Sequence, residues 1–256
     1  MPLTSEQKSG LNVALNEASL LGLEVRSDGT IAAATFSVLT LPPEGPAPED
    51  TRVQFQFAPV GRVVASLRLG RWDDAHAQAV PFPLERLLEV VQEFGSQPIF
   101  GAEFFDIHEA VLAKMAGRHS LDFRGPSAGL THSINVFQAG PDKFLDVCLW
   151  FDKLRILRPP VMEPVSLDEF IAGGQRWWDG LNSGDPRTAG RGITPLPPMI
   201  QFEGGTVLSQ AEYMRLQEEA IKWFQRNPGK QLTQEEFLRL GKGSAPTKWW
   251  QFWKRR

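Results

Sequence analysis

Apolar and polar side chains alternate with a period of two over residues 19–68, and turn residues interrupt the alternation. This pattern predicts consecutive strands of an antiparallel sheet. Asp28-Gly29 is a dipeptide typical of tight hairpins. In the segment 51–57, TRVQFQF, three apolar residues alternate with polar ones, so we expect one sheet face to be buried and the other to contact water.

The middle of the chain combines helical and strand patterns. The segment 83–94 carries apolar residues at helical spacing and stops at Gly95, which predicts one helix. A second helix is expected after PIFGAEFF. Strands are expected again in HSLDFR, THSINVFQ and KFLDVCLWFDKLRIL. The last is apolar on both faces around Cys148 and Trp150, so it is predicted to be a central strand covered on both sides.

A third helix is predicted to begin at Ser166, where Glu169 completes a capping box. Glycines within this helix weaken the prediction unless they permit close packing. Residues 183–206 are rich in Gly and Pro and have no sustained period, which favours a linker or a strap over the body. Two further capping boxes, Ser209 with Glu212 and Thr233 with Glu236, predict two more helices.

These patterns predict an α+β fold: a mostly antiparallel, meandering sheet with helices packed on one face, plus a helical C-terminal appendage. The expected division is a globular domain at 1–182, a linker or strap at 183–206, a helical appendage at 207–240 and a flexible tail at 241–256. The two halves of the domain share an outline of strand, loop and strand. This outline has two explanations, an ancestral duplication or the general resemblance of short alternating strands.

Composition narrows the class of protein. Of the 256 residues, 42% are hydrophobic and 22% are charged, as in ordinary soluble globular proteins. No segment approaches the ~20 apolar residues needed to span a bilayer, so we expect a cytoplasmic protein. Cys148 is the single cysteine, which excludes an internal disulfide and a cysteine-based zinc site. Its apolar neighbours favour a buried, inert thiol.

The charges are distributed unevenly. The net charge is −3, and removing the four cations of the last nine residues leaves −7 for the rest of the chain. An acidic body argues against nucleic-acid binding, which requires a concentrated basic face. Three arginines, Arg62, Arg68 and Arg71, could still form a strip for an anionic partner on the sheet face that contacts water. The alternative is that they serve solubility only.

Two groups of residues carry candidate chemistry. Glu103, Asp106, His108 and Glu109 lie within seven residues, and such a group could bind a metal or perform acid and base catalysis. Asp106 and Glu109 are also spaced as a helix cap, which explains both carboxylates without chemistry. Asp73, Asp74 and His76 form a second group in a predicted loop. No phosphate-binding loop, nucleophile elbow or dinucleotide fingerprint occurs, so no cofactor and no metal is expected.

The chain ends in KWWQFWKRR, a segment of four aromatic residues and four cations. In a helix, Trp249, Trp250, Phe252 and Trp253 would share one face, and Lys248, Lys254 and Arg255 would occupy the rest, with Arg256 at the end. Nine residues are too few for a stable isolated helix, so the aromatics need a surface to bury them. The candidates are the protein's own body, a partner protein and an anionic membrane surface.

The expected function is therefore that of a non-enzymatic cytoplasmic interaction protein, an adaptor or an immunity-type binding module. Its tail would dock on an unknown protein partner or tether the chain at the inner face of the membrane. The alternative is a hydrolase or metal-binding enzyme with an unrecognised site at Glu103, His108, Asp73, Asp74 or His76.

Overall fold

A computed structural model describes residues 3–70, 77–95, 97–105, 118–126, 131–191, 199–202, 205–227 and 232–240. The chain forms two compact units, Met1–Ala189 and Gly190–Arg256. The boundary between the two units falls inside the segment 183–206.

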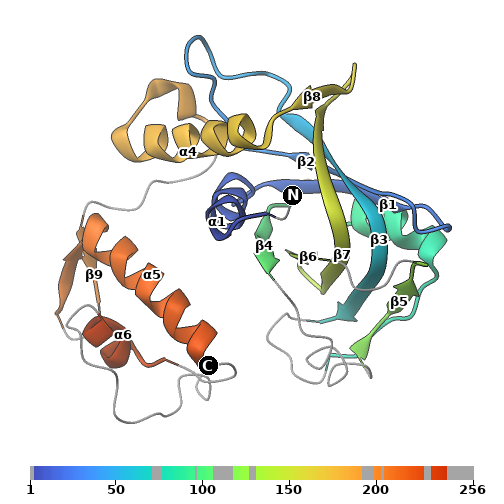
Figure 1. The fold of residues 1–256 in the computed structure, drawn as a ribbon. Helices are drawn as coiled ribbons and strands as arrows, with labels where there is room; N and C mark the ends of the chain where they lie inside the picture. Colours follow the sequence, from blue (N-terminus) through green and yellow to red (C-terminus); the bar gives the residue numbers. More distant parts are fainter. Residues whose placement is uncertain are drawn as a thin grey trace. The chain divides into compact units, whose positions relative to one another are not determined.

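An antiparallel sheet forms the centre of the first unit (Figure 1). Its main strand order is β1-β2-β3-β7-β6-β4, β5 pairs with β3, and β8 pairs with β7. The strands are β1 Ser19–Val25, β2 Ala32–Ser37, β3 Arg52–Leu69, β4 Ile99–Phe105, β5 Leu121–Arg124, β6 His132–Ala139, β7 Lys143–Arg158 and β8 Glu163–Val165. The predicted α+β class and the mostly antiparallel sheet are confirmed.

The two longest strands, β3 and β7, lie side by side at the centre of the sheet. Their pairing runs from Gln54 opposite Leu157 to Leu69 opposite Lys143. The predicted central position of β7 is thus confirmed. A bulge between Val60 and Arg62 shifts the register within β3, and the strand continues through it from Arg52 to Leu69.

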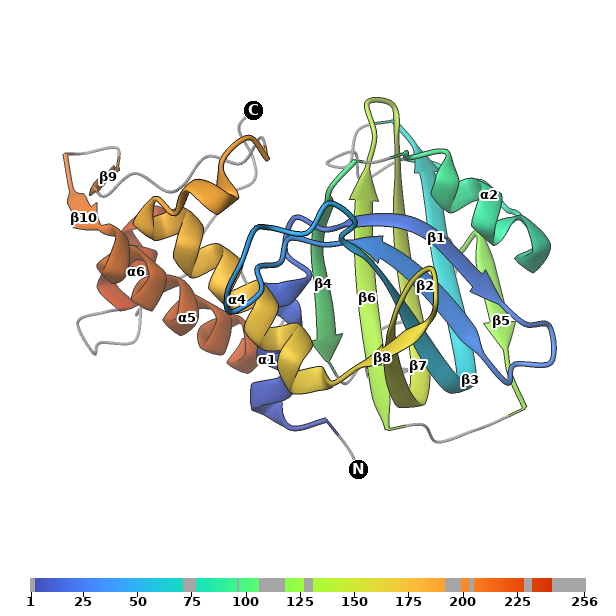
Figure 2. The same ribbon diagram turned by 90° about the horizontal axis from the view of Figure 1, so that it is seen from above.

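The sheet bends until its two edge strands meet at one end. Ser19 at the start of β1 forms a bridge with Pro98, and the Ile99 amide donates to the Ala18 carbonyl at 2.7 Å. Figure 2 shows the start of β1 beside the start of β4. This curvature gives the sheet an inner face, which carries the core. Aromatic rings dominate part of it: the centroid of Phe55 lies 5.3 Å from Phe36 and 5.2 Å from Phe170.

Three helices bury apolar residues in this one core: α1 Ser5–Ala14 through Leu11, α2 Leu87–Gln92 through Val91, and α4 Leu167–Ser183 through Phe170. A 3₁₀ turn, η1 Leu84–Arg86, precedes α2, and another, η3 Pro186–Thr188, follows α4. The predicted cap of α4 is confirmed, since the Glu169 amide donates to Ser166 Oγ at 3.1 Å. The helix expected after PIFGAEFF lies outside the described residues.

The sequence interpretation missed α1. Its capping box is nevertheless complete, because the Gln7 amide donates to Thr4 Oγ1 at 3.1 Å and the Gln7 side chain accepts from the Thr4 amide at 3.0 Å. The helix packs against α4 and β4. Leu3, which precedes α1, donates its amide hydrogen to His132 of β6 at 3.0 Å, so the start of this helix lies against the sheet.

The second unit contains a short hairpin, β9 Met199–Gln201 and β10 Val207–Ser209, followed by α5 Gln210–Arg226 and α6 Gln234–Leu240. Both predicted capping boxes form: the Glu212 amide donates to Ser209 Oγ at 3.3 Å, and the Glu236 amide donates to Thr233 Oγ1 at 3.1 Å. The segment predicted as a linker contains η3 and β9, so part of it has regular structure.

Candidate functional site

The edge of β7 is unpaired in the middle of the strand. On that edge, β6 pairs with β7 as far as Phe151, and β8 pairs only from Ile156 onward. In the part of the chain that the structure describes, no segment pairs with residues 152–155 from this side. Alternate residues of a strand direct both backbone groups toward the same neighbour, so this stretch offers N–H and C=O groups to an added strand.

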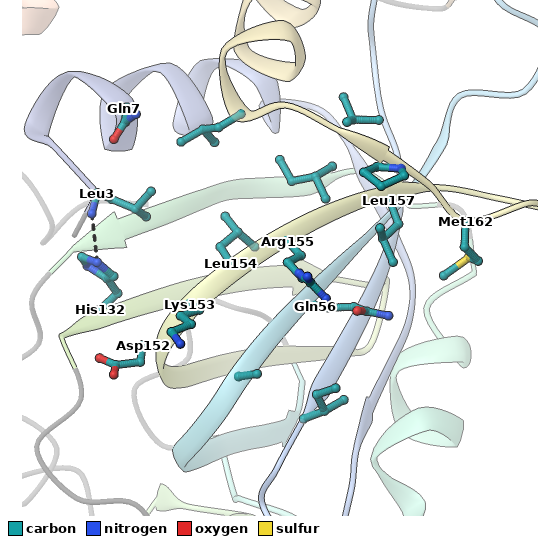
Figure 3. A pocket seen from close by; sticks show the side chains of 16 residues that line it. Leu3, Gln7, Gln56, His132, Asp152, Lys153, Leu154, Arg155, Leu157 and Met162 are labelled. Atoms are coloured by element: carbon teal, nitrogen blue, oxygen red, sulfur yellow. Dashed lines mark hydrogen bonds between the residues drawn. The ribbon is translucent and has the colours of Figure 1, made fainter. Parts of the chain in front are cut away.

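A groove of about 930 Å³ lies along this edge. We refer to it as the β7 groove, lined among others by Leu3, Gln56, Lys153, Leu154, Arg155 and Met162. Figure 3 shows its lining residues, which come from α1, β3, β6, β7, β8 and α4 and from the segments that lead into α1, β2 and β8.

The lining comes from both faces of β7. Leu154 pairs with Phe57, whose ring is in the core, whereas Lys153 and Arg155 pair with Ala58 and Gln56 on the opposite face. Gln56 and Ala58 belong to β3, so the groove extends from the face that β3 and β7 share to the unpaired edge of β7. The part of the groove beside residues 152–155 is at the position that a neighbouring strand would occupy.

Leu3, which precedes α1, and Gln7 of α1 line one end of the groove. The Leu3 amide donates to His132 Nε2 at 3.0 Å, as the dashed line in Figure 3 marks. His132 is 4% exposed. Because Nε2 accepts this hydrogen bond, the ring proton of the neutral imidazole is on Nδ1. The histidine thus positions the start of α1 beside β7.

An acidic residue lies at the same end of the groove. Asp152 is exposed, and the Thr131 hydroxyl donates to its Oδ1 at 2.8 Å. This hydrogen bond lowers the pKa of the Asp152 carboxyl below its ordinary value, and Lys153 acts in the same direction. Asp152 is therefore ionised at neutral pH.

Two cations on β7 line the groove. The side chains of Lys153 and Arg155 are exposed, and within the described residues no carboxylate lies within 4.0 Å of either cation. Neighbouring cations differ in this respect: Arg158 lies 3.8 Å from Glu169, and Lys143 lies 2.6 Å from Glu93. The groove therefore presents positive charge that the body does not neutralise by direct pairing.

Two of the three arginines of the proposed strip, Arg62 and Arg68, are among the residues that the structure describes. Arg62 forms two hydrogen bonds with Asp122, at 2.7 and 2.8 Å, and Arg68 lies 2.7 Å from Asp146, with its guanidinium carbon 4.1 Å from the Phe144 ring centroid. Arg71 lies outside the described residues. Both described arginines already have carboxylate partners, so an anionic ligand would have to compete with these ion pairs.

The two ion pairs affect their carboxylates in opposite ways. The hydrogen bond from Arg62 lowers the pKa of Asp122. Burial raises the pKa of Asp146, and Arg68 opposes that increase only in part. The two pKa values move in opposite directions because the hydrogen bond from Arg62 outweighs burial at Asp122, whereas burial outweighs the attraction of Arg68 at Asp146.

Cys148 is unsuited to nucleophilic chemistry. Burial raises the pKa of its thiol to about 12, and nearby Asp146 adds to the increase. Its Sγ donates to Asn135 Oδ1 at 3.2 Å. The thiol is therefore protonated at neutral pH and lacks the thiolate needed for attack.

Most of the candidate enzymatic residues cannot be placed. Asp73, Asp74, His76, Asp106, His108 and Glu109 lie outside the described residues, as does the tail with Trp249, Trp250, Phe252, Trp253, Lys254, Arg255 and Arg256. Glu103 is on β4, exposed and opposite Asn135. Among the described residues, no group of three or more His, Cys, Asp or Glu side chains could hold a metal ion.

The sequence interpretation did not identify the β7 groove. Its signal was present in DKLRI, where polar residues interrupt a strand that is apolar elsewhere.

No family model matches the chain, and no curated protein or solved structure is significantly similar to it. None of the described helices is long and apolar enough to cross a membrane.

Proposed function

We propose that this chain is a non-enzymatic interaction protein, an adaptor or an immunity-type binding module, and that its body binds a segment of a partner protein. The observation that carries the proposal is the β7 groove beside an unpaired strand edge. Exposed edges of this kind accept extended peptides through backbone hydrogen bonds.

Two features favour a peptide over a small molecule. Small-molecule sites bury most of the ligand in an enclosed, mainly apolar cavity. The β7 groove instead carries exposed charged residues, Asp152, Lys153 and Arg155, along a strand. Its apolar contacts come from side chains such as Leu154, beside backbone groups that can pair. This combination suits a partner with an extended backbone and alternating side chains.

The proposal includes a cytoplasmic location and a second attachment through the tail. Both rest on the sequence alone. The aromatic-basic tail would tether the chain to an anionic membrane surface or dock on a protein, while the β7 groove binds the partner segment. The two attachments would be independent, so each can be tested in a variant that retains the other.

A selection experiment tests the role of the groove. A random-peptide display library is selected on the full chain, and the dissociation constants of the recovered peptides are measured in solution. The variant Gln56→Trp places a large ring beside Arg155 on the exposed face of the groove, because Gln56 lines the groove and pairs with Arg155. We expect this variant to bind the peptides at least ~10-fold more weakly, which corresponds to about 1.4 kcal/mol.

The matched control is Gln54→Trp. Gln54 lies two residues earlier on the same face of β3, and its Oε1 accepts a hydrogen bond from Gln56 Nε2 at 3.0 Å, but it does not line the groove. We expect this control to retain wild-type affinity. Recovery of no binding peptide, or equal binding to Gln56→Trp and the wild type, would refute the proposed function.

A further inference from the structure

We infer that the partner segment is an acidic, extended peptide that binds as an additional strand between β6 and β8, along residues 152–155 of β7. This inference rests on the proposed function and names the chemistry of the ligand. It combines two independent observations: the interruption of strand pairing on this edge and the sign of the charges that line it.

The geometry of the β7 groove favours a ligand that binds as an extended strand. The groove reaches both faces of β7, with Leu154 and Ile156 on the core side and Lys153 and Arg155 on the other. A strand added at this edge would place successive side chains on these two faces alternately. One set would meet apolar side chains, including Leu3 and Leu167, and the other would meet the two cations. The matching ligand therefore alternates apolar and charged residues.

The charges specify acidic residues. Lys153 and Arg155 project from alternate positions of the strand and therefore share one face. Opposite charges on neighbouring strands stabilise pairing, and like charges oppose it. Asp152 is the acidic residue among those that line the groove, and its Oδ1 already accepts a hydrogen bond from Thr131. Acidic ligand residues are therefore expected opposite Lys153 and Arg155 and away from Asp152.

The same charges disfavour two other occupants. The basic end of this chain carries four cations within its last nine residues and would be repelled by Lys153 and Arg155. A second copy that paired through its own β7 edge would bring the same cations close to one another. An acidic segment of a different protein avoids both penalties.

A pair of synthetic peptides tests the charge preference. One alternates valine with glutamate and the other alternates valine with lysine, and both carry the same fluorophore. Fluorescence anisotropy with the full chain is expected to give at least ~10-fold tighter binding for the glutamate peptide. In the variant Lys153→Glu/Arg155→Glu this preference should be lost or reversed.

The control for that variant is Arg26→Glu/Arg124→Glu. It changes the net charge by the same amount at two exposed positions that do not line the groove. We expect it to retain the preference for the glutamate peptide. If both double variants weaken binding equally, the attraction is a general effect of net charge and the inference fails.

Backbone methylation tests the strand geometry. Two versions of the glutamate peptide carry N-methyl groups, one on the odd residues and the other on the even residues. A bound strand directs the amides of one set to β7 and those of the other set away from it. We therefore expect one version to lose at least ~10-fold in affinity and the other to bind as the parent does.

The possible failures are distinguishable. If library peptides bind in a manner sensitive to Gln56→Trp but show no preference for glutamate, or lose affinity equally with both methylated sets, the inference is wrong and the proposed function stands. If no peptide of either kind binds the full chain, both are wrong. Binding of the glutamate peptide that is unaffected by Gln56→Trp would place it elsewhere and overturn the inference.

Discussion

Gly174 of α4 packs directly against the backbone of Ala14 of α1, and the missing side chain of the glycine makes room for this contact. A β-carbon added to Gly174 would lie 2.5 Å from Cα of Ala14, a separation that a real side chain cannot adopt without moving the backbone of α1. The glycine that weakened the helix prediction is therefore a packing residue. This contact holds α1 against α4, and Leu3, which precedes α1, lines the β7 groove.

We predict that Gly174→Ala destabilises the first unit. In an open helix position this substitution would stabilise by up to about 1 kcal/mol through helix propensity. Here overpacking dominates, at a cost of about 1–3 kcal/mol. Urea unfolding monitored by far-ultraviolet circular dichroism should show a lower midpoint. The control Gln175→Ala, at an exposed neighbouring position of α4, should change stability by less than about 0.5 kcal/mol. A higher midpoint for Gly174→Ala would show that α1 and α4 are not in close contact.

We predict that the ion pair of Arg62 with Asp122 stabilises the folded state and that this stabilisation is lost in acid. The pKa of Asp122 is lower in the folded state than its ordinary value of 3.8. Its contribution is therefore present above that value and declines as the pH falls through the folded pKa. Solvent screening limits the expected cost of Asp122→Asn to about 0.5–1 kcal/mol near neutral pH. This cost should shrink below about pH 4.

For the ion pair of Arg68 with Asp146 we predict the opposite dependence of stability on pH. Burial raises the pKa of Asp146 in the folded state, so its contribution is greatest below the ordinary value of 3.8 and declines as the pH rises through the folded pKa. Asp146→Asn keeps an oxygen that can accept from Arg68 but removes the carboxyl whose ionisation burial opposes. The free energy of unfolding of the wild type should therefore fall relative to that of the variant as the pH rises from 3 to 7. Urea midpoints of the wild type and both Asn variants between pH 3 and 7 measure the two slopes, and parallel slopes would contradict the assignment.

Cys148 should resist alkylation in the folded protein. A thiol with a pKa of about 12 is ionised at pH 8 about a thousandfold less than an ordinary cysteine. We expect labelling by iodoacetamide, followed by mass spectrometry, to be slower by at least that factor before unfolding than in urea. The variant Val161→Cys adds an exposed thiol and should be labelled once, rapidly, while Cys148 remains unmodified. Fast labelling of Cys148 in the folded wild type would show that the central strand is accessible.

Local patterns were sufficient to predict much of the fold. The alternation in β3 and the Ser166 cap are properties of short segments, and both are present as predicted. The helix α1 was missed because Gly10 and several polar residues obscure its apolar stripe. That stripe includes Leu11 and Ala14, which are buried in the fold, where distant α4 and β4 pack against α1.

The β7 groove could not be predicted from local patterns. It exists because β6 stops pairing at Phe151 and β8 starts at Ile156, and both limits depend on segments distant from residues 152–155. The arginine strip illustrates the same limit. The sequence indicated the face on which Arg62 and Arg68 lie, but not that Asp122 and Asp146 lie beside them.

From its sequence, we predict that the aromatic-basic tail at residues 248–256 attaches the chain to an anionic membrane surface. Each cation near an anionic bilayer contributes about 1 kcal/mol, so the basic residues alone give weak attraction that salt reduces. The aromatic side chains must supply the remainder by leaving water. The full chain should therefore sediment with vesicles that contain phosphatidylserine more than with pure phosphatidylcholine. Raising the salt concentration should release it.

The aromatic and basic contributions can be separated. Trp249→Ala/Trp250→Ala/Trp253→Ala should nearly abolish sedimentation at low salt, although all four terminal cations remain. Gln56→Trp serves as the control, because it alters the β7 groove and leaves the tail intact; it should sediment as the wild type does. If the full chain ignores anionic vesicles and removal of residues 242–256 lowers the melting temperature, the tail docks on its own body. If neither effect occurs, membrane tethering and self-docking are both excluded, and a protein partner is the remaining surface for these aromatics.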